Sequence, residues 1–247
     1  MKNIWTIIKK ELFTYFLSPI AYVALFVFLL YNGIVFYIIL QILNQPMSIT
    51  GAPMALFFGQ IIFFYLLIIV LCSILTMRSL AEERRSGTFE TLMTSPVTDL
   101  QVVVGKFLSA WLFYIILWVP TLLYPIILER YSDPDWGPIA SGYLGTILLG
   151  GLFIAIGVFT SSLTKNQLIA SILSFLILGI FFVLGLMEYI SGESLLKSVF
   201  SYINIWAHME DFSKGIVDTK RLVYYSTMII LFIFAAMKSF QLKRIRS

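Results

Sequence analysis

The chain has 247 residues, of which 60% are hydrophobic and 12% are charged, and its formal net charge is +4. Soluble domains carry about 25% charged residues, so a water-soluble fold is excluded because its surface would be largely apolar. The basic residues are spread over several segments instead of gathering on one folded face, and a nucleic-acid partner is therefore not expected.

The apolar residues fall in six long runs separated by more polar connections. A helix of about 20 residues crosses the roughly 30 Å hydrocarbon layer, and only a helix satisfies its backbone polar groups within one such run. We therefore predict an all-α integral membrane protein, with a single transmembrane domain over residues 1–247. Its six spans are expected at about residues 20–41, 56–76, 103–127, 139–163, 168–187 and 222–237.

Residues 3–17, ahead of the first span, have the pattern of an amphipathic helix. An apolar stripe is formed by Ile4, Ile7, Ile8 and Leu12, and the opposite side carries Lys9, Lys10 and Glu11. We expect this helix to lie in the membrane interface. The alternative is a basic flank that simply precedes the first span.

Lysine and arginine are divided unevenly between the two sides of the predicted membrane. Twelve of the 17 fall on the side of the two termini; the other five are Arg130, Lys197, Lys214, Lys220 and Arg221. Because loops rich in Lys and Arg stay in the cytoplasm, both termini are predicted to be cytoplasmic.

The cytoplasmic connection between the second and third spans begins with a charged segment. Ser79 with Glu82 predicts a capping box that restarts the helix, and Thr98 with Gln101 predicts a second one that opens the third span. Glu82 of the first box opens a run of four consecutive charged residues: Glu82, Glu83, Arg84 and Arg85.

A short apolar helix is predicted in the middle of the same connection. Gly87 permits a sharp bend, and Phe89, Leu92 and Met93 then fall at i, i+3 and i+4 on one helix face. An apolar knob beside charges is what a docking element needs, since burial supplies affinity and charge supplies orientation. The alternative is a solvated loop held only by its ends.

Three further features concern the outer half of the protein and the fourth span. Pro120 and Pro125 predict a bend in the third span, either a hinge or a static kink. Ser141-xxx-Gly145 and Gly151-xxx-Ala155 are spaced for close helix contact, either within the chain or in a dimer. Residues 188–221 are expected to form short external helices.

The sequence does not favour an enzyme. A phosphate-binding loop is absent, because Gly105-Lys106 is followed by Phe107 and no glycine-rich turn precedes it. Ser73, Ser109, Ser171 and Ser174 lie in or near spans without a base to activate them, and we expect no catalytic residue, cofactor or metal in this chain. The remaining alternatives are a stand-alone channel or scaffold subunit and, less favoured, an intramembrane enzyme.

Two segments carry a family resemblance. The stretch Met77–Val97, with its run EERRSGTFETLMTSPV, resembles the first cytoplasmic loop of ABC-2 type transporter permeases. The run His208–Asp218 with Tyr224-Tyr225 is similar to the subgroup that contains the gliding-motility permease GldF and the permease of the nitrous-oxide reductase maturation system.

The resemblance implies a permease subunit of the bacterial inner membrane, paired with a second permease subunit that is identical or related. A separate ABC ATPase would bind ATP and Mg²⁺ and drive export or force transmission, with gliding motility or secretion as the setting. The coupling helix would be Gly87–Ser95, with Glu82, Glu83 and Glu90 as nearby acidic contacts. Further implied partners are the lipid bilayer and an accessory subunit facing the periplasm.

Overall fold

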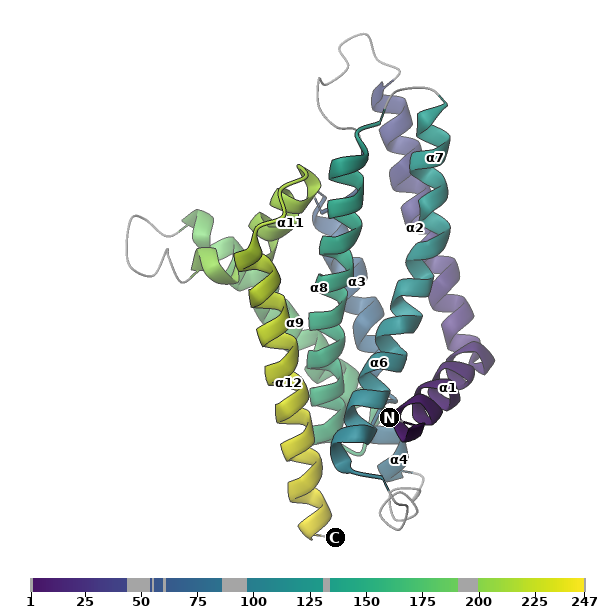
Figure 1. The fold of residues 1–247 in the computed structure, drawn as a ribbon, viewed down its shortest axis with the longest axis vertical. Coiled ribbons are helices and arrows are strands. Elements are labelled where there is room, and N and C mark those ends of the chain that lie inside the picture. The colour runs from purple at the N-terminus through teal and green to yellow at the C-terminus, as the bar shows by residue number, and fades with distance from the viewer. Residues whose placement is uncertain are drawn as a thin grey trace.

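The computed structural model describes residues 2–43, 54, 56–59, 61–85, 97–130, 134–190 and 200–246. The elements in these ranges are helices (Figure 1). They are α1 (Lys2–Leu17), α2 (Pro19–Leu43), α3 (Ile62–Thr76), α4 (Ala81–Arg85), α6 (Asp99–Trp118), the 3-10 helix η2 (Val119–Leu122), α7 (Leu123–Glu129), α8 (Trp136–Leu163), α9 (Gln167–Ile190), α11 (Ile205–Ser213) and α12 (Thr219–Arg246).

Six helical runs within the described ranges are long and apolar enough to cross a membrane, which confirms the predicted fold class. They are Pro19–Leu43, Ile62–Glu83, Asp99–Glu129, Trp136–Leu163, Gln167–Glu188 and Thr219–Leu242. The second begins at Ile62, later than the predicted start at residue 56. Phe57 and Phe58 belong to the apolar run of the sequence but not to the helix. They lie in a turn before it and are apolar because they are buried within the protein.

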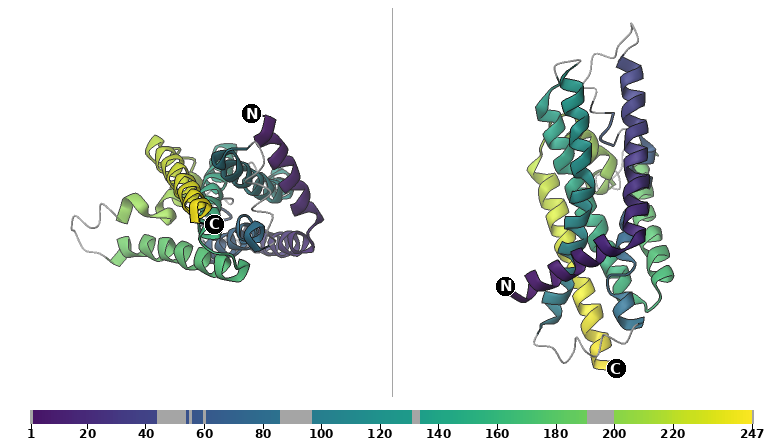
Figure 2. Two further views of the ribbon diagram at one scale, coloured as in Figure 1. Left: turned by 90° about the horizontal axis from the view of Figure 1, so that it is seen from below. Right: turned by 90° about the vertical axis from the view of Figure 1, so that its right-hand side faces the viewer.

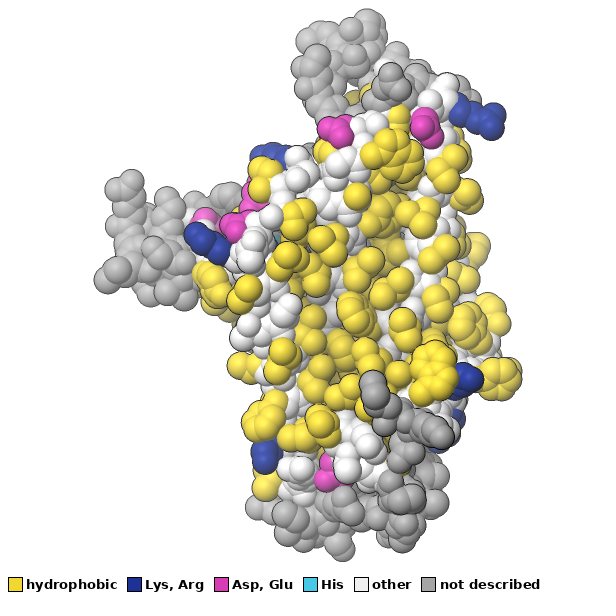
Figure 3. Space-filling model, in the orientation of Figure 1, with side chains coloured by type: hydrophobic (Ala, Val, Ile, Leu, Met, Phe, Trp, Pro, Cys, Tyr) yellow, Lys and Arg dark blue, Asp and Glu magenta, His cyan; other side chains and the backbone are white. Residues whose placement is uncertain are grey.

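Helix α8 is the centre of the bundle. It packs against α3, α6, α9, α11 and α12, and 78% of its most apolar window is buried, against 17% for α12. Figure 1 shows α8 running between α12 and α6. The outer helices turn apolar side chains outwards, and Figure 3 shows these side chains covering the middle of one face while most charged side chains lie towards its ends.

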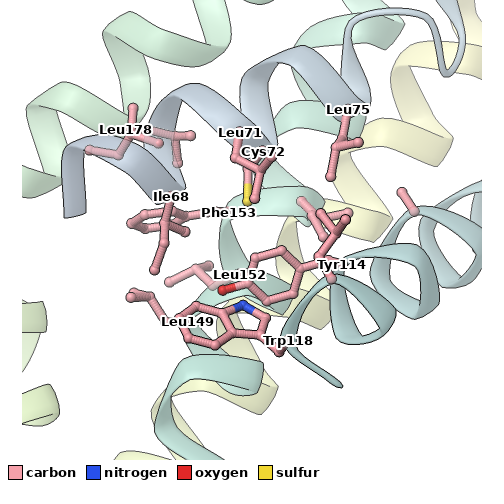
Figure 4. Packing of buried hydrophobic residues seen from close by; sticks show 14 of the residues in the cluster. Ile68, Leu71, Cys72, Leu75, Tyr114, Trp118, Leu149, Leu152, Phe153 and Leu178 are labelled. Atoms are coloured by element: carbon pink, nitrogen blue, oxygen red, sulfur yellow. The ribbon is translucent and has the colours of Figure 1, made fainter. Parts of the chain in front are cut away.

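Aromatic and aliphatic side chains together fill the core between α3, α6 and α8 (Figure 4). The Tyr114 ring of α6 lies between Cys72 of α3 and Trp118 of α6, next to Leu152 of α8. The Tyr114 hydroxyl donates a hydrogen bond to the carbonyl of Thr146 at 3.2 Å, so this buried polar group is satisfied.

The small residues of α8 allow side chains of other helices to pack closely against it. A Cβ atom at Gly145 would lie 2.6 Å from Cδ2 of Phe212, and one at Gly151 would lie 3.1 Å from the Trp111 ring. The Ser141 hydroxyl donates to the carbonyl of Phe212 at 2.6 Å, and Ala155 is fully buried. Both small-residue motifs therefore serve packing within the chain.

The third span is interrupted as the prolines predict. Pro120 lies in η2, between α6 and α7. The Thr121 hydroxyl donates to the carbonyl of Trp118 at 2.7 Å and lies 3.0 Å from the Tyr143 hydroxyl of α8. These bonds replace part of the helical ladder and tie the interruption to the central helix, which favours a static kink over a hinge.

The two ends of the chain lie at the same end of the bundle. Helix α1 crosses the lower part of the long helices at a steep angle, and the last turns of α12 extend past the level of α1 at the same end (Figure 2). Helix α4 lies at this end too (Figure 1). At the other end, α11 confirms a short helix between the fifth and sixth spans.

Candidate functional site where α1, α4 and α6 meet

The structure describes only the first part of the predicted docking segment. Glu82 and Arg85 are exposed on α4, while Glu83 is half-buried and faces the bundle. Arg84 belongs to the same helix, but its side chain is outside the description. The predicted coupling helix at residues 87–95 also lies outside the described residues, together with Gly87, Phe89, Glu90, Leu92 and Met93.

The two predicted capping boxes have different outcomes. Thr98 and Gln101 form theirs, with side-chain to backbone distances of 3.2 and 3.3 Å. The box at Ser79 is wrong, because its hydroxyl finds no hydrogen-bond partner among the described residues.

Ser161 of α8 caps α4 instead. Its hydroxyl oxygen accepts the amides of Leu80 and Ala81 at 3.0 and 3.1 Å. This cap ties the start of α4 to the central helix. Ser161 is about 80 residues away in the chain, so no local pattern could have identified it.

Lys106 is the centre of the junction, and sequence analysis indicated only a charge near the predicted cytoplasmic side at this position. Its Nζ lies 3.0 Å from Oε1 of Glu11 on α1 and 2.9 Å from Oε1 of Glu83 on α4. The three side chains are 4%, 18% and 12% exposed, respectively. One buried ammonium group therefore joins carboxylates from two other helices.

The available local signal was a lysine within an apolar helix that begins at a recognisable cap. At about 1.5 Å per residue, Lys106 lies about 10 Å along α6 from Asp99. The run Asp99–Glu129 has 31 residues and is about 46 Å long, which exceeds the roughly 30 Å of hydrocarbon. Lys106 thus lies near one boundary of the apolar layer, not at its centre.

Helix α1 is fixed to α6 by apolar contacts as well. Ile7 lies against Gly105, where an added Cβ would come within 2.8 Å of its Cγ2. The Tyr15 and Phe113 rings stack with centroids 5.1 Å apart. The Tyr15 hydroxyl donates to the carbonyl of Leu75 at 2.9 Å, and burial, with a smaller contribution from Glu11, raises its pKa.

The apolar stripe predicted on residues 3–17 therefore faces protein. Ile8 is buried against the bundle, and Glu11 lies on this side, not opposite the stripe as predicted. The outward side of α1 carries exposed large apolar residues: Trp5, Phe13, Phe16 and Leu17.

The junction is suited to holding helices together, not to bond chemistry. Removing one partner from a buried ion pair typically costs about 3–5 kcal/mol because the other charge stays buried. Serines considered as nucleophiles instead make hydrogen bonds within or between helices. Ser73 donates to Ser174 at 3.3 Å, and Ser109 donates to the carbonyl of Lys106 at 2.8 Å. Among the described residues, no three His, Cys, Asp or Glu side chains are placed to hold a metal ion.

At the opposite end, the run His208–Asp218 forms the larger part of α11 and its link to α12. Arg221 donates to Oδ2 of Asp211 from two nitrogens, at 3.1 and 3.4 Å. The imidazole of His208 is buried, with its ring centroid 5.0 Å from Tyr224 and 5.6 Å from Tyr225. Burial, and secondarily the Arg221 charge, lower the pKa of His208 to about 3, so it is neutral at physiological pH.

Comparison with known proteins identifies related membrane proteins. The chain is similar to the probable multidrug ABC transporter permease YbhR of Escherichia coli K12 and to its counterpart in strain O157:H7. Each is 27% identical over 145 residues, which cover 58% of this chain and 39% of the relative. The match thus spans well under half of these relatives. Residues 36–238 match the family described as ABC-2 family transporter protein, and this multi-pass membrane protein therefore belongs to the ABC-2 transporter permease family.

Proposed function

We propose that the chain is the transmembrane subunit of a bacterial inner-membrane ABC transporter. A separate ATPase would bind ATP and Mg²⁺, dock on the segment at residues 87–95, and drive a rearrangement of the spans for export or force transmission. Family membership supports this reading. The observation that carries it is the Glu83–Lys106 bridge, which links the helix leading into that segment directly to the third span.

The wider assembly follows from the same proposal. Two permease subunits, identical or related, would pair in the bilayer above two ATPase domains. The end that carries α1, α4 and the end of α12 would face the cytoplasm, since it holds most of the Lys and Arg residues. The opposite end, with α11, would face the periplasm and any accessory subunit.

We further propose membership of the gliding-motility and nitrous-oxide reductase maturation subgroup. Support comes from the resemblance of the run His208–Asp218. Residues of this run hold the external segment together, since His208 is buried and Asp211 forms an ion pair with Arg221.

The proposal is tested by isolating the chain from its native cells in mild detergent and identifying co-purified proteins. We expect a soluble protein with a Walker A motif. Phe89→Asp combined with Leu92→Asp should abolish its recovery, because two buried charges would replace the apolar docking surface. Thr91→Asp, in the same predicted helix but off its apolar side, is the matched control and should retain the partner.

Two results would contradict the proposal. Recovery of the chain alone across several detergents would favour a stand-alone channel or scaffold. Unchanged recovery of the ATPase with the Phe89/Leu92 double substitution, in a chain that still folds, would place the docking site elsewhere.

A further inference from the structure

We propose that Lys106 is a positioning residue that joins α1, α4 and the adjoining part of α6 into one mechanical unit. The transmission of ATPase motion through this unit rests on the proposed function. The joining of the three helices by Lys106 does not. The juxtaposition behind it is one buried ammonium group between Glu11 and Glu83.

The contacts of α4 show why Lys106 matters. Helix α4 has only five residues, and its helix contacts are chiefly with α8 and α9. Ser161 of α8 fixes its first amides. In the described part of the chain, the Glu83–Lys106 ion pair joins α4 to α6, and the same Lys106 nitrogen also contacts Glu11 of α1.

Helices α1 and α6 do not depend on this charge alone. Ile7 packs on Gly105, and Tyr15 stacks on Phe113. Loss of the Glu83 carboxylate should therefore detach α4 from α1 and α6, while α1 and α6 stay packed against each other. A displacement of α4 by a docked partner would, in the intact protein, reach both α1 and the third span through one side chain.

The charge balance of the junction also predicts which substitutions it tolerates. Two carboxylates surround one ammonium group, so each contact is charge-assisted and Lys106 is bound from two sides. Glu83→Ala leaves a matched Lys106–Glu11 pair and should fold. Lys106→Glu, in contrast, would bring three carboxylates together in a poorly solvated site, which strongly disfavours the junction.

The experiment measures the distance between spin labels on α1 and α4 by double electron–electron resonance. Labels are attached to cysteines at Thr14 and Arg85, both exposed, in a Cys72→Ala background reconstituted in lipid nanodiscs. The unaltered junction should give one narrow distance distribution. Glu83→Ala should broaden and shift it, whereas Glu82→Ala, the exposed neighbour on the same helix, should not.

A charge exchange provides the second test. Lys106→Glu should lose the narrow distribution, Lys106→Arg should keep it, and Lys106→Glu with Glu83→Lys should regain it, because the pair restores two carboxylates and one ammonium group. A purely steric role would not predict recovery by the exchange. If Lys106→Glu fails to fold, the Glu83→Ala and Glu82→Ala comparison still decides.

The co-purified complex with the ATPase provides the third test. Trapping it with ATP and vanadate should leave the α1–α4 distance unchanged, and Glu83→Ala should let that distance change. Equal distributions for Glu83→Ala and Glu82→Ala, or a changed distance in the trapped unaltered complex, would overturn the inference. Failure to recover any ATPase would instead count against the proposed function, since the nanodisc measurements need no partner.

Discussion

At the scale of single residues, the two most informative side chains are buried groups whose partners come from other helices. The Lys106 ammonium contacts Glu11, which is 95 residues away in the sequence. His208 lies against Tyr224 and Tyr225 of the next helix. Their residue types were visible in the sequence, but burial and neighbours decide what each one does, and these depend on the packing of whole helices.

His208 gives a pH prediction. Its pKa is about 3 in the folded chain and about 6.5 when unfolded. Well above pH 6.5 the His208 imidazole is neutral in both the folded and the unfolded chain, so it adds no pH dependence to stability there. As pH falls from 6.5 towards 3, the unfolded chain binds a proton that the folded one does not, so stability decreases, by about 2 kcal/mol at pH 5.

Thermal unfolding in detergent between pH 8 and pH 5 measures this effect. His208→Phe keeps an aromatic ring and should lose less stability over that interval than the unaltered chain. The carboxylates contribute equally to both proteins, so the difference isolates His208. Parallel curves for the two proteins would show that His208 does not titrate as described.

At the scale of helices, periodicity predicted which segments are helical better than where they begin. The apolar run before α3 includes Phe57 and Phe58, which fill an interhelical space and are not helical. Apolar character alone does not separate a residue that faces lipid from one that faces protein. The capping box at Thr98 was reliable because both of its bonds are local, whereas the cap of α4 comes from another helix.

The central helix gives a packing prediction with an internal control. A Cβ atom at Gly150 would overlap the Tyr114 ring, which is fully buried and held by its bond to Thr146. At Gly179 of α9, an added Cβ would meet nothing within 4 Å. Gly150→Ala should therefore destabilise the chain by about 1–3 kcal/mol, while Gly179→Ala should be neutral or stabilising by up to about 1 kcal/mol.

Chemical or thermal unfolding of the two variants in one detergent tests this difference. Both substitutions gain the same intrinsic helix propensity, so their difference reports steric overlap alone. Equal stability of the two variants would mean that Tyr114 moves aside without cost.

At the scale of the whole molecule, the arrangement of the ends agrees with an even number of spans. Helices α1 and α4 and the end of α12 lie towards one end of the bundle, and α7 and α11 lie towards the other (Figure 1). The direction in which this bundle sits in the membrane rests on the distribution of Lys and Arg residues.

Labelling of single cysteines with an impermeant thiol reagent in intact cells tests that direction. Cysteines replacing Pro46 and Lys197 should react, because both connections are predicted to be external, and one replacing Ser86 should react only after the membrane is opened. The native Cys72 is fully buried and should stay silent. The reverse pattern would invert the topology.

The sequence by itself determined the fold class, a helical membrane protein with six candidate spans, because each apolar run is long enough to cross the hydrocarbon layer and only a helix satisfies its backbone polar groups there. It also located the charged segment at residues 82–85 and the cap at Thr98, since both are local features. Tertiary structure decided that Glu83 turns inwards, that Glu11 faces the bundle, and that Lys106 binds both. A side chain's burial depends on which helices approach it, and no pattern within a single helix contains that information.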